Sequence, residues 1–144
     1  MSATEGLKIG KVIFNILSNS SSVLGVTGMT AGKIQPAPMK NPKAPEIGVL
    51  YEFDAVNPVN QKRLIRVETA PLYIVDFTCE CIALDYGTSI TLADAVGQAL
   101  QEAVSGTYNG IKVDGINLTN AREDYNKQRR YYSKSLSFQA RVLI

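Results

Sequence analysis

The sequence predicts an α/β (α+β) fold in which two helices cover one face of a largely antiparallel sheet of about five strands. Two long segments, residues 72–84 and 131–144, alternate apolar and polar residues as half-buried strands do. Two others, residues 5–18 and 85–106, repeat apolar residues every three or four positions, which is typical of amphipathic helices. Because each helix has a single apolar face, both are expected on the same face of the sheet. The expected order is α-β-β-β-α-β-β, in a single domain of residues 1–144.

The first helix is expected at about residues 5–18 and should end in the polar, turn-forming stretch 18–22. Its buried stripe is expected to contain Ile9, Val12, Ile13, Ile16 and Leu17. Residues 33–46 hold four prolines, which lack a backbone donor and favour an extended surface segment. A long irregular segment in a small domain is often functional, so Lys40 and Lys43 are candidate interaction residues. The alternative is a plain extended loop that leads into the next strand.

Three strands are expected in the middle of the chain. Residues 46–55 alternate cleanly enough to bury one face. A turn at residues 56–61 joins them to a second strand at residues 62–69. Residues 72–84 form a long central strand. One face of this central strand is expected to carry Tyr73, Val75, Phe77, Cys79, Cys81 and Ala83.

The strongest helix pattern spans residues 85–106, with Asp94 expected in the first turn and Gly106 just past the end. Its apolar stripe comprises Leu92, Ala95, Val96, Ala99, Leu100, Ala103 and Val104. Small residues dominate this stripe and permit close packing on a sheet. A further strand is expected at residues 109–124, interrupted at Asp114–Gly115, before the final alternating strand.

The composition excludes many kinds of enzyme. The chain has no histidine, which removes the commonest general base and the commonest transition-metal ligand. It also has no glycine-rich phosphate-binding motif. Cys79 and Cys81 fall on the same face of one strand, where they are poorly placed for a disulfide, so buried inert thiols are expected. We therefore expect no catalytic residue, no cofactor and no metal.

A few carboxylates offer a competing interpretation. Glu68, Asp76 and Glu80, with Arg66 nearby, have some similarity to the carboxylate cluster of a metal-dependent nuclease. Such a site also needs a lysine at the scissile phosphate, and no lysine follows within the strand. A solvated or interfacial strand face is the simpler interpretation.

The small net charge of +2 hides a separation of charge along the chain. Residues 1–67 carry a net charge of +4, residues 68–105 carry −6 and residues 106–144 carry +4. A chain with acidic and basic regions can meet copies of itself with opposite charges facing, so the pattern favours self-association. No stretch has the roughly 18 to 20 uncharged apolar residues of a membrane span, and the beginning lacks a signal peptide's apolar core, so no membrane association is expected.

The stretch "NKQRRYYSKS", residues 126–135, raises the possibility of nucleic-acid binding, which requires cations for phosphates and exposed rings for stacking. If the final strand buries the face that carries Leu136, Phe138, Ala140 and Val142, however, Tyr132 lies on the buried face and Tyr131 on the opposite one. The two rings then cannot form one stacking platform. The stretch then becomes a basic hairpin tip whose simpler interpretation is a loop in a protein contact or in solvent. Its candidate interaction residues are Lys127, Arg129, Arg130 and Tyr131.

The order and spacing of these patterns are similar to those of a known family. The relevant pieces are "IGKVIFNILSNSSSV", "KIQPAPMKNPKAPEIGVLYEF", "VDFTCECIALDYGTSITLADAVGQALQEAV" and "REDYNKQRRYYSKSLSFQARV". Across about residues 9–143 the chain resembles the tail completion, or head–tail joining, proteins of long-tailed bacteriophages and prophages, which are also grouped with tail terminators.

This resemblance implies an α/β fold with a helix-covered sheet and assembly into a ring that is usually hexameric. It also implies a place in the virion, at the head-proximal end of the tail tube, after assembly in the host cytoplasm. The expected partners are further copies of the chain, the tail tube protein and the head connector or stopper protein, with transient contact to DNA in the channel. The family contributes no catalytic residues. The alternative function is that of a small nucleic-acid-binding protein that uses the basic hairpin at residues 127–134.

Overall fold

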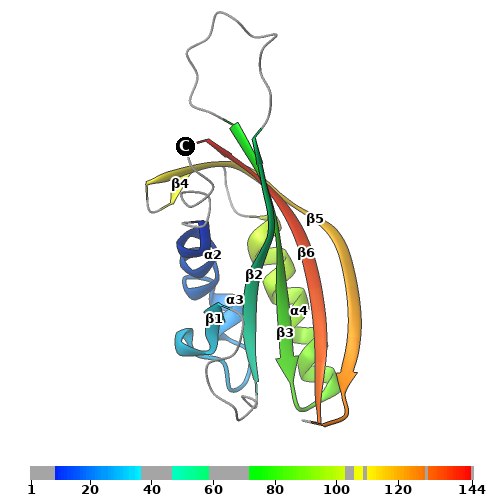
Figure 1. Cartoon of the computed structure of the whole chain (residues 1–144). Helices are drawn as coiled ribbons and strands as arrows, with labels where there is room; N and C mark the ends of the chain where they lie inside the picture. The colour runs from blue at the N-terminus through cyan, green and yellow to red at the C-terminus, as the bar shows by residue number, and fades with distance from the viewer. Residues whose placement is uncertain are drawn as a thin grey trace, which may run out of the picture.

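The computed structural model describes residues 9–36, 47–58, 72–102, 106–108, 110–128 and 130–143 (Figure 1). The helices of this part of the chain are α2 (Ile9–Ser18), α3 (Ser21–Leu24) and α4 (Tyr86–Gln101), with a 3-10 helix, η1 (Ala31–Lys33). Its strands are β1 (Ile34–Pro36), β2 (Ile47–Pro58), β3 (Leu72–Ala83), β4 (Gly106–Tyr108), β5 (Ile111–Asn126) and β6 (Tyr131–Leu143). None of the described helices combines the length and apolar character needed to cross a membrane.

The described strands form one curled sheet in the order β1-β2-β3-β6-β5-β4. β1 runs parallel to β2, and the other neighbouring pairs are antiparallel. The helices lie against one face, which we name the inner face: α4 contacts β3, β5 and β6, and α2 contacts β1 and α4 (Figure 1). The predicted α+β class is confirmed, with six described strands where about five were expected.

The core lies between the helices and the inner face of the sheet. All six inner-face residues predicted for the central strand are buried: Tyr73, Val75, Phe77, Cys79, Cys81 and Ala83. The Phe77 ring stacks on Phe138 of β6, with ring centres 5.3 Å apart, and lies 6.4 Å from the ring of Phe53 on β2. These aromatic contacts join the three middle strands.

α2 buries the predicted stripe, because all five residues expected in that stripe are buried. An added Cβ at Gly10 would lie 3.4 Å from the Tyr51 ring, so the helix passes close over β2. After α2 the chain turns at Asn19, as expected, and then forms the short helix α3, which was not expected. Its start is capped by the Ser20 hydroxyl, which accepts a hydrogen bond from the Val23 N–H at 3.3 Å, and fully buried Val23 anchors it.

The predicted position of Asp94 in the first turn of α4 is wrong. The helix begins one residue after Asp85, whose carboxylate accepts a hydrogen bond from the Thr88 N–H at 3.0 Å. Asp94 consequently lies in the middle of the helix. α4 ends at Gln101, and Gly106 begins β4 instead of capping the helix.

Three further differences concern the strands. The proline-rich segment 33–46 begins with β1, in which buried Ile34 pairs with Val49, whereas residues 37–46 lie outside the described part. β2 continues through the expected turn to Pro58, because its pairing with β3 extends to Tyr73. The strand expected at residues 62–69 lies outside the described residues.

The expected interruption of β5 at Asp114–Gly115 is confirmed, because the β5–β6 register shifts between Val113 and Gly115. A second shift, between Leu118 and Asn120, was not anticipated. Such bulges bend a strand and increase its twist, in keeping with the curvature of β5 in Figure 1.

Replacing Phe77 with Ala should lower the free energy of unfolding by about 3 to 5 kcal/mol, since it removes a fully buried ring that contacts two others. Urea unfolding followed by circular dichroism measures this loss. Asn117→Ala, at an exposed position of β5, is the control and should change stability by less than about 0.5 kcal/mol. Equal effects of the two substitutions would contradict the proposed core.

Candidate interaction surfaces

The basic hairpin tip connects β5 to β6. Lys127 and Arg130 are exposed there, while Arg129 lies outside the described residues. Arg130 has a positive φ of 56°, and its N–H donates to the Asn126 carbonyl oxygen at 2.7 Å, which closes the turn. The tip therefore presents at least two cations on a tightly turned backbone. The other candidate cations, Lys40 and Lys43, lie outside the described residues.

The two tyrosines after the tip point to opposite faces of the sheet, as predicted. Tyr132 lies on the inner face, where it contacts Tyr86 of α4. Tyr131 lies on the outer face and is only 6% exposed, because it packs with Leu50 and Ile82. In the single chain, Tyr131 therefore leaves little of its ring available for the expected external contact. Its hydroxyl accepts a hydrogen bond from the Asn126 amide at 3.3 Å, which supports the turn.

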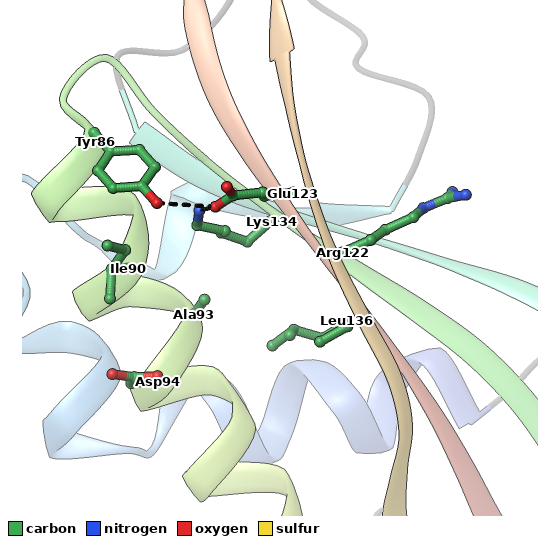
Figure 2. A pocket seen from close by; sticks show the side chains of 9 residues that line it. Tyr86, Ile90, Ala93, Asp94, Arg122, Glu123, Lys134 and Leu136 are labelled. Carbon is green, nitrogen blue, oxygen red and sulfur yellow. Dashed lines mark hydrogen bonds and ion pairs between the residues drawn. The ribbon is translucent and has the colours of Figure 1, made fainter.

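Lys134 forms an ion pair at the inner face of the sheet, although the sequence analysis assigned this residue to the basic hairpin tip. Lys134 is 8% exposed and pairs with Glu123, its cross-strand neighbour on β5. The Tyr86 hydroxyl donates to the same carboxylate at 3.1 Å, and the Lys134 ammonium lies 4.3 Å from the centre of the Tyr86 ring (Figure 2). Lys134 thus fixes the start of α4 to the β5–β6 hairpin.

These contacts shift the pKa values of both members of the pair. Hydrogen bonds from Lys134 and then Tyr86 lower the pKa of Glu123. For Lys134, desolvation is the largest influence and lowers the pKa, but the hydrogen bond and charge of Glu123 outweigh it, so the pKa is raised overall. Both groups are therefore charged at neutral pH.

Three tyrosine rings extend this cluster. The ring of Tyr132 lies 5.2 Å from that of Tyr86 and 4.8 Å from that of Tyr125, measured between centres. Tyr86 and Tyr125 remain partly exposed, at 44% and 41%. The cluster depends on residues from α4, β5 and β6, so no short sequence motif could have revealed it.

A groove of about 380 Å³ runs beside the ion pair, between α4 and the β5–β6 hairpin (Figure 2). It is lined from α4 by Tyr86, Ile90, Ala93 and Asp94, from β5 by Ala121, Arg122 and Glu123, and from β6 by Lys134 and Leu136. The Arg122 side chain points away from the groove in Figure 2. We name this feature the α4–β5 groove.

The outer face of the sheet is polar where the nuclease-like interpretation placed its carboxylates. Asp76 accepts a hydrogen bond from the Gln139 amide at 3.2 Å, and Glu80 accepts one from the Ser133 hydroxyl at 3.0 Å. Glu68 and Arg66 lie outside the described residues. Within the described part, no three His, Cys, Asp or Glu side chains come together in a way that could hold a metal ion. The arrangement is that of a hydrogen-bonded strand face.

Cys79 and Cys81 are fully buried free thiols on the inner face. Burial raises the pKa of Cys79, helped by neighbouring Cys81, and burial likewise raises the pKa of Cys81, helped by Glu80. The predicted inert character of the thiols agrees with this environment, since the reactive thiolate is disfavoured.

The fold is similar to that of a solved virion component. A chain of the structure described as "Virion of native gene transfer agent (GTA) particle" superposes with a TM-score of 0.66 and 18% sequence identity. The alignment covers 92% of this chain and 92% of that chain. At this identity the likeness establishes the fold. No protein-family model matches the sequence, and no curated protein matches it either.

Replacing Lys134 with Met should lower the melting temperature at pH 7, because the Glu123 carboxylate loses its buried cation. Since the pKa of Glu123 is lowered by folding, its contribution is present above the unfolded pKa and is lost as the pH falls through the folded pKa. The difference in melting temperature between the Lys134→Met variant and the original chain should therefore become smaller as the pH falls. Calorimetry from pH 7 down to pH 3 measures it, with Lys127→Met at the exposed tip as control. A difference that is independent of pH would contradict the role of the pair.

Proposed function

We propose that this chain is a structural, non-enzymatic virion protein that forms a ring at the head-proximal end of a phage tail tube. The ring terminates the tube and joins the tail to the head connector. The observation that carries this proposal is the likeness, over 92% of both chains, to a component of a phage-like virion particle. We propose further that the protein is located in the virion after assembly in the host cytoplasm; the likeness to a virion component supports the virion location.

The described surfaces suit assembly better than catalysis. The charged side chains of the inner-face cluster are paired with one another, and the outer-face carboxylates accept hydrogen bonds from neighbouring strands. The surfaces that remain available for contacts with other proteins are a largely polar sheet face, a basic tip and a partly apolar groove. Many weak contacts of this kind, repeated by symmetry, sum to a stable joint.

The proposed partners are copies of this chain, the tail tube protein and the head connector or stopper protein. The basic tip, with Lys127, Arg129 and Arg130, and the segment that holds Lys40 and Lys43 are the proposed contacts to acidic surfaces of these partners. Exposed cations at Lys127 and Arg130 support this assignment for the tip.

Nucleic-acid binding by the tip is the second candidate, and the exposed Lys127 and Arg130 favour it. The tyrosines do not add a stacking platform, since Tyr131 is buried and Tyr132 packs between Tyr86 and Tyr125. Only contacts to phosphates remain for the described tip residues. Such contacts would suit DNA that passes through the channel of a ring.

Light scattering at low and moderate salt, with and without DNA, separates these two functions. The ring subunit should give a mass several times that of the 15.6 kDa chain, and negative stain should show rings. A persistent monomer that binds DNA, with an affinity that falls steeply as salt rises, would contradict the proposal.

Replacing Arg129 and Arg130 with Asn should leave the melting temperature unchanged and weaken binding to the tail tube or connector protein. Asn tolerates the left-handed backbone of Arg130, so the turn is preserved. Lys112→Asn with Arg141→Asn removes the same charge at exposed positions near the other end of the hairpin and serves as control. Co-sedimentation with the two partner proteins is the measurement. Equal loss of binding in both variants would show that total charge matters and the tip does not.

A further inference from the structure

We propose that two copies of this chain associate through the open edge of β5, with the two strands antiparallel about a two-fold axis at Glu123. The contact extends the sheet of one copy into that of the other. It is independent of the contact that would close a ring, because a two-fold contact joins two copies and no more. The open edge, the direction of its backbone groups, its charges and the sizes of its side chains each support this pairing.

β5 is a long strand whose edge is open along most of its length (Figure 1). β4 pairs only with residues 111–113, so residues 114–126 have no described strand on the side away from β6. Residues 120–126 form the longest part of this open edge without a shift in the β5–β6 register. Long exposed edges are normally blocked or used for pairing with another chain. An uninterrupted stretch of strand is therefore available for such pairing.

The backbone N–H of Tyr125 points to this open edge. It donates a hydrogen bond to the Asp124 carboxylate at 2.8 Å, although Tyr125 lies opposite Tyr132 in the β5–β6 register. Backbone groups in a strand point alternately to its two sides, so those of Ala121 and Glu123 share the direction of Tyr125. These three residues therefore supply the donors and acceptors with which the edge can bind a second strand.

The charges of the edge are complementary to those of the same edge in a second copy. Arg122 and Asp124 are both exposed, and both lie on the outer face of the sheet. With the two-fold axis at Glu123, Arg122 of each copy lies directly opposite the partner's Asp124. Opposite charges that face each other across two strands stabilise the pairing. The symmetry repeats the contact, so one register forms two ion pairs.

The neighbouring registers lack this complementarity. An axis at residue 122 would place arginine opposite arginine, and an axis at residue 124 would place aspartate opposite aspartate. An axis at residue 121 or residue 125 brings no opposite charges together within residues 118–126. Like charges directly opposite each other destabilise a pair of strands. The charges therefore select the axis at Glu123.

The inner-face side chains fit the same register by size. Tyr125, which is 41% exposed, lies opposite the partner's Ala121, a small residue that lines the α4–β5 groove. The tyrosine ring of each copy thus has room to cover apolar surface of the other. Glu123 meets its equivalent at the axis, but each Glu123 is already paired with Lys134 of its own chain. Both faces of the strand are therefore compatible with the axis that the charges select.

An exchange of charges between two chains tests the register. One chain carries Arg122→Asp and the other carries Asp124→Arg. Each chain alone places like charges opposite each other at both sites, so its dissociation constant for self-association should rise about tenfold or more. An equimolar mixture places aspartates opposite arginines at both sites, so the mixed dimer should form with about the affinity of the original chain. Sedimentation at low salt measures these affinities.

The control mixture combines Arg141→Asp with Glu102→Arg. These substitutions change the charges of the two chains by the same amounts, at exposed positions outside the edge of β5. Each control chain should associate like the original chain, and mixing should bring no gain. Single variants at the edge that associate as tightly as the original chain would overturn the proposal. A control mixture that gains as much as the test mixture would overturn it too.

Disulfide trapping supplies a second arm that detects weak association. A chain with Arg122→Cys is mixed with a chain with Asp124→Cys under oxidised glutathione, since these positions lie opposite each other in the proposed register. The native thiols of Cys79 and Cys81 are buried and do not compete. Mixed dimer should exceed, by roughly fivefold or more, that from a control mixture with Asn117→Cys in place of Asp124→Cys.

The absence of any excess of mixed dimer would overturn the proposal, also where the original chain sediments as a monomer. The proposed function is tested separately by the presence of rings. If rings form while the edge variants and the trapping show no pairing of β5, this interface is wrong and the proposed function stands.

Discussion

The alternation of β3 is the constraint on which the rest of the structure depends. Every second residue from Tyr73 to Ala83 is buried on the inner face, and the intervening positions carry Asp76, Thr78 and Glu80 on the outer face. A shift of one residue would bury carboxylates and expose Phe77, so the register against β2 and β6 is strongly specified. The Phe77–Phe138 stack lies at the middle of this register. The inner face determines where α2 and α4 pack, and the outer face is polar in its middle, with one small apolar cluster of Leu50, Ile82 and Tyr131.

The apolar pattern of β6 ends at Leu136, and the interaction surfaces begin there. The next inner-face positions are occupied by Lys134 and Tyr132, beyond the main core. The chain satisfies the buried cation with Glu123 and the ring of Tyr86, and this fixes the start of α4 to the hairpin. Because small residues, Ala93 and Ala121, face each other beyond this pair, the space between α4 and β5 stays open as a groove. The groove is thus a direct consequence of how the core ends.

Local patterns allowed the sequence to predict much of the fold, but little of the site. The α2 stripe, the faces of β3, the β5 interruption at Asp114–Gly115 and the opposite directions of Tyr131 and Tyr132 each depend on periodicity within one element. β1 was missed because three residues carry too little pattern, and its pairing with β2 is set by the tertiary fold. The burial of Tyr131 depends on Leu50 and Ile82, and that of Lys134 on Glu123 and Tyr86. Contacts between distant segments of this kind leave no mark on local periodicity.

The open edge of β5 and the separation of charge along the chain are the observations that favour self-association of the subunit. Hydrogen exchange, measured on the chain below and above the concentration at which it associates, tests this claim most directly. Backbone amides at the edge of β5, within residues 114–126, should exchange more slowly in the associated form, because association is expected to cover this edge. Unchanged exchange along this edge, with slowing confined to other surfaces, would contradict the account.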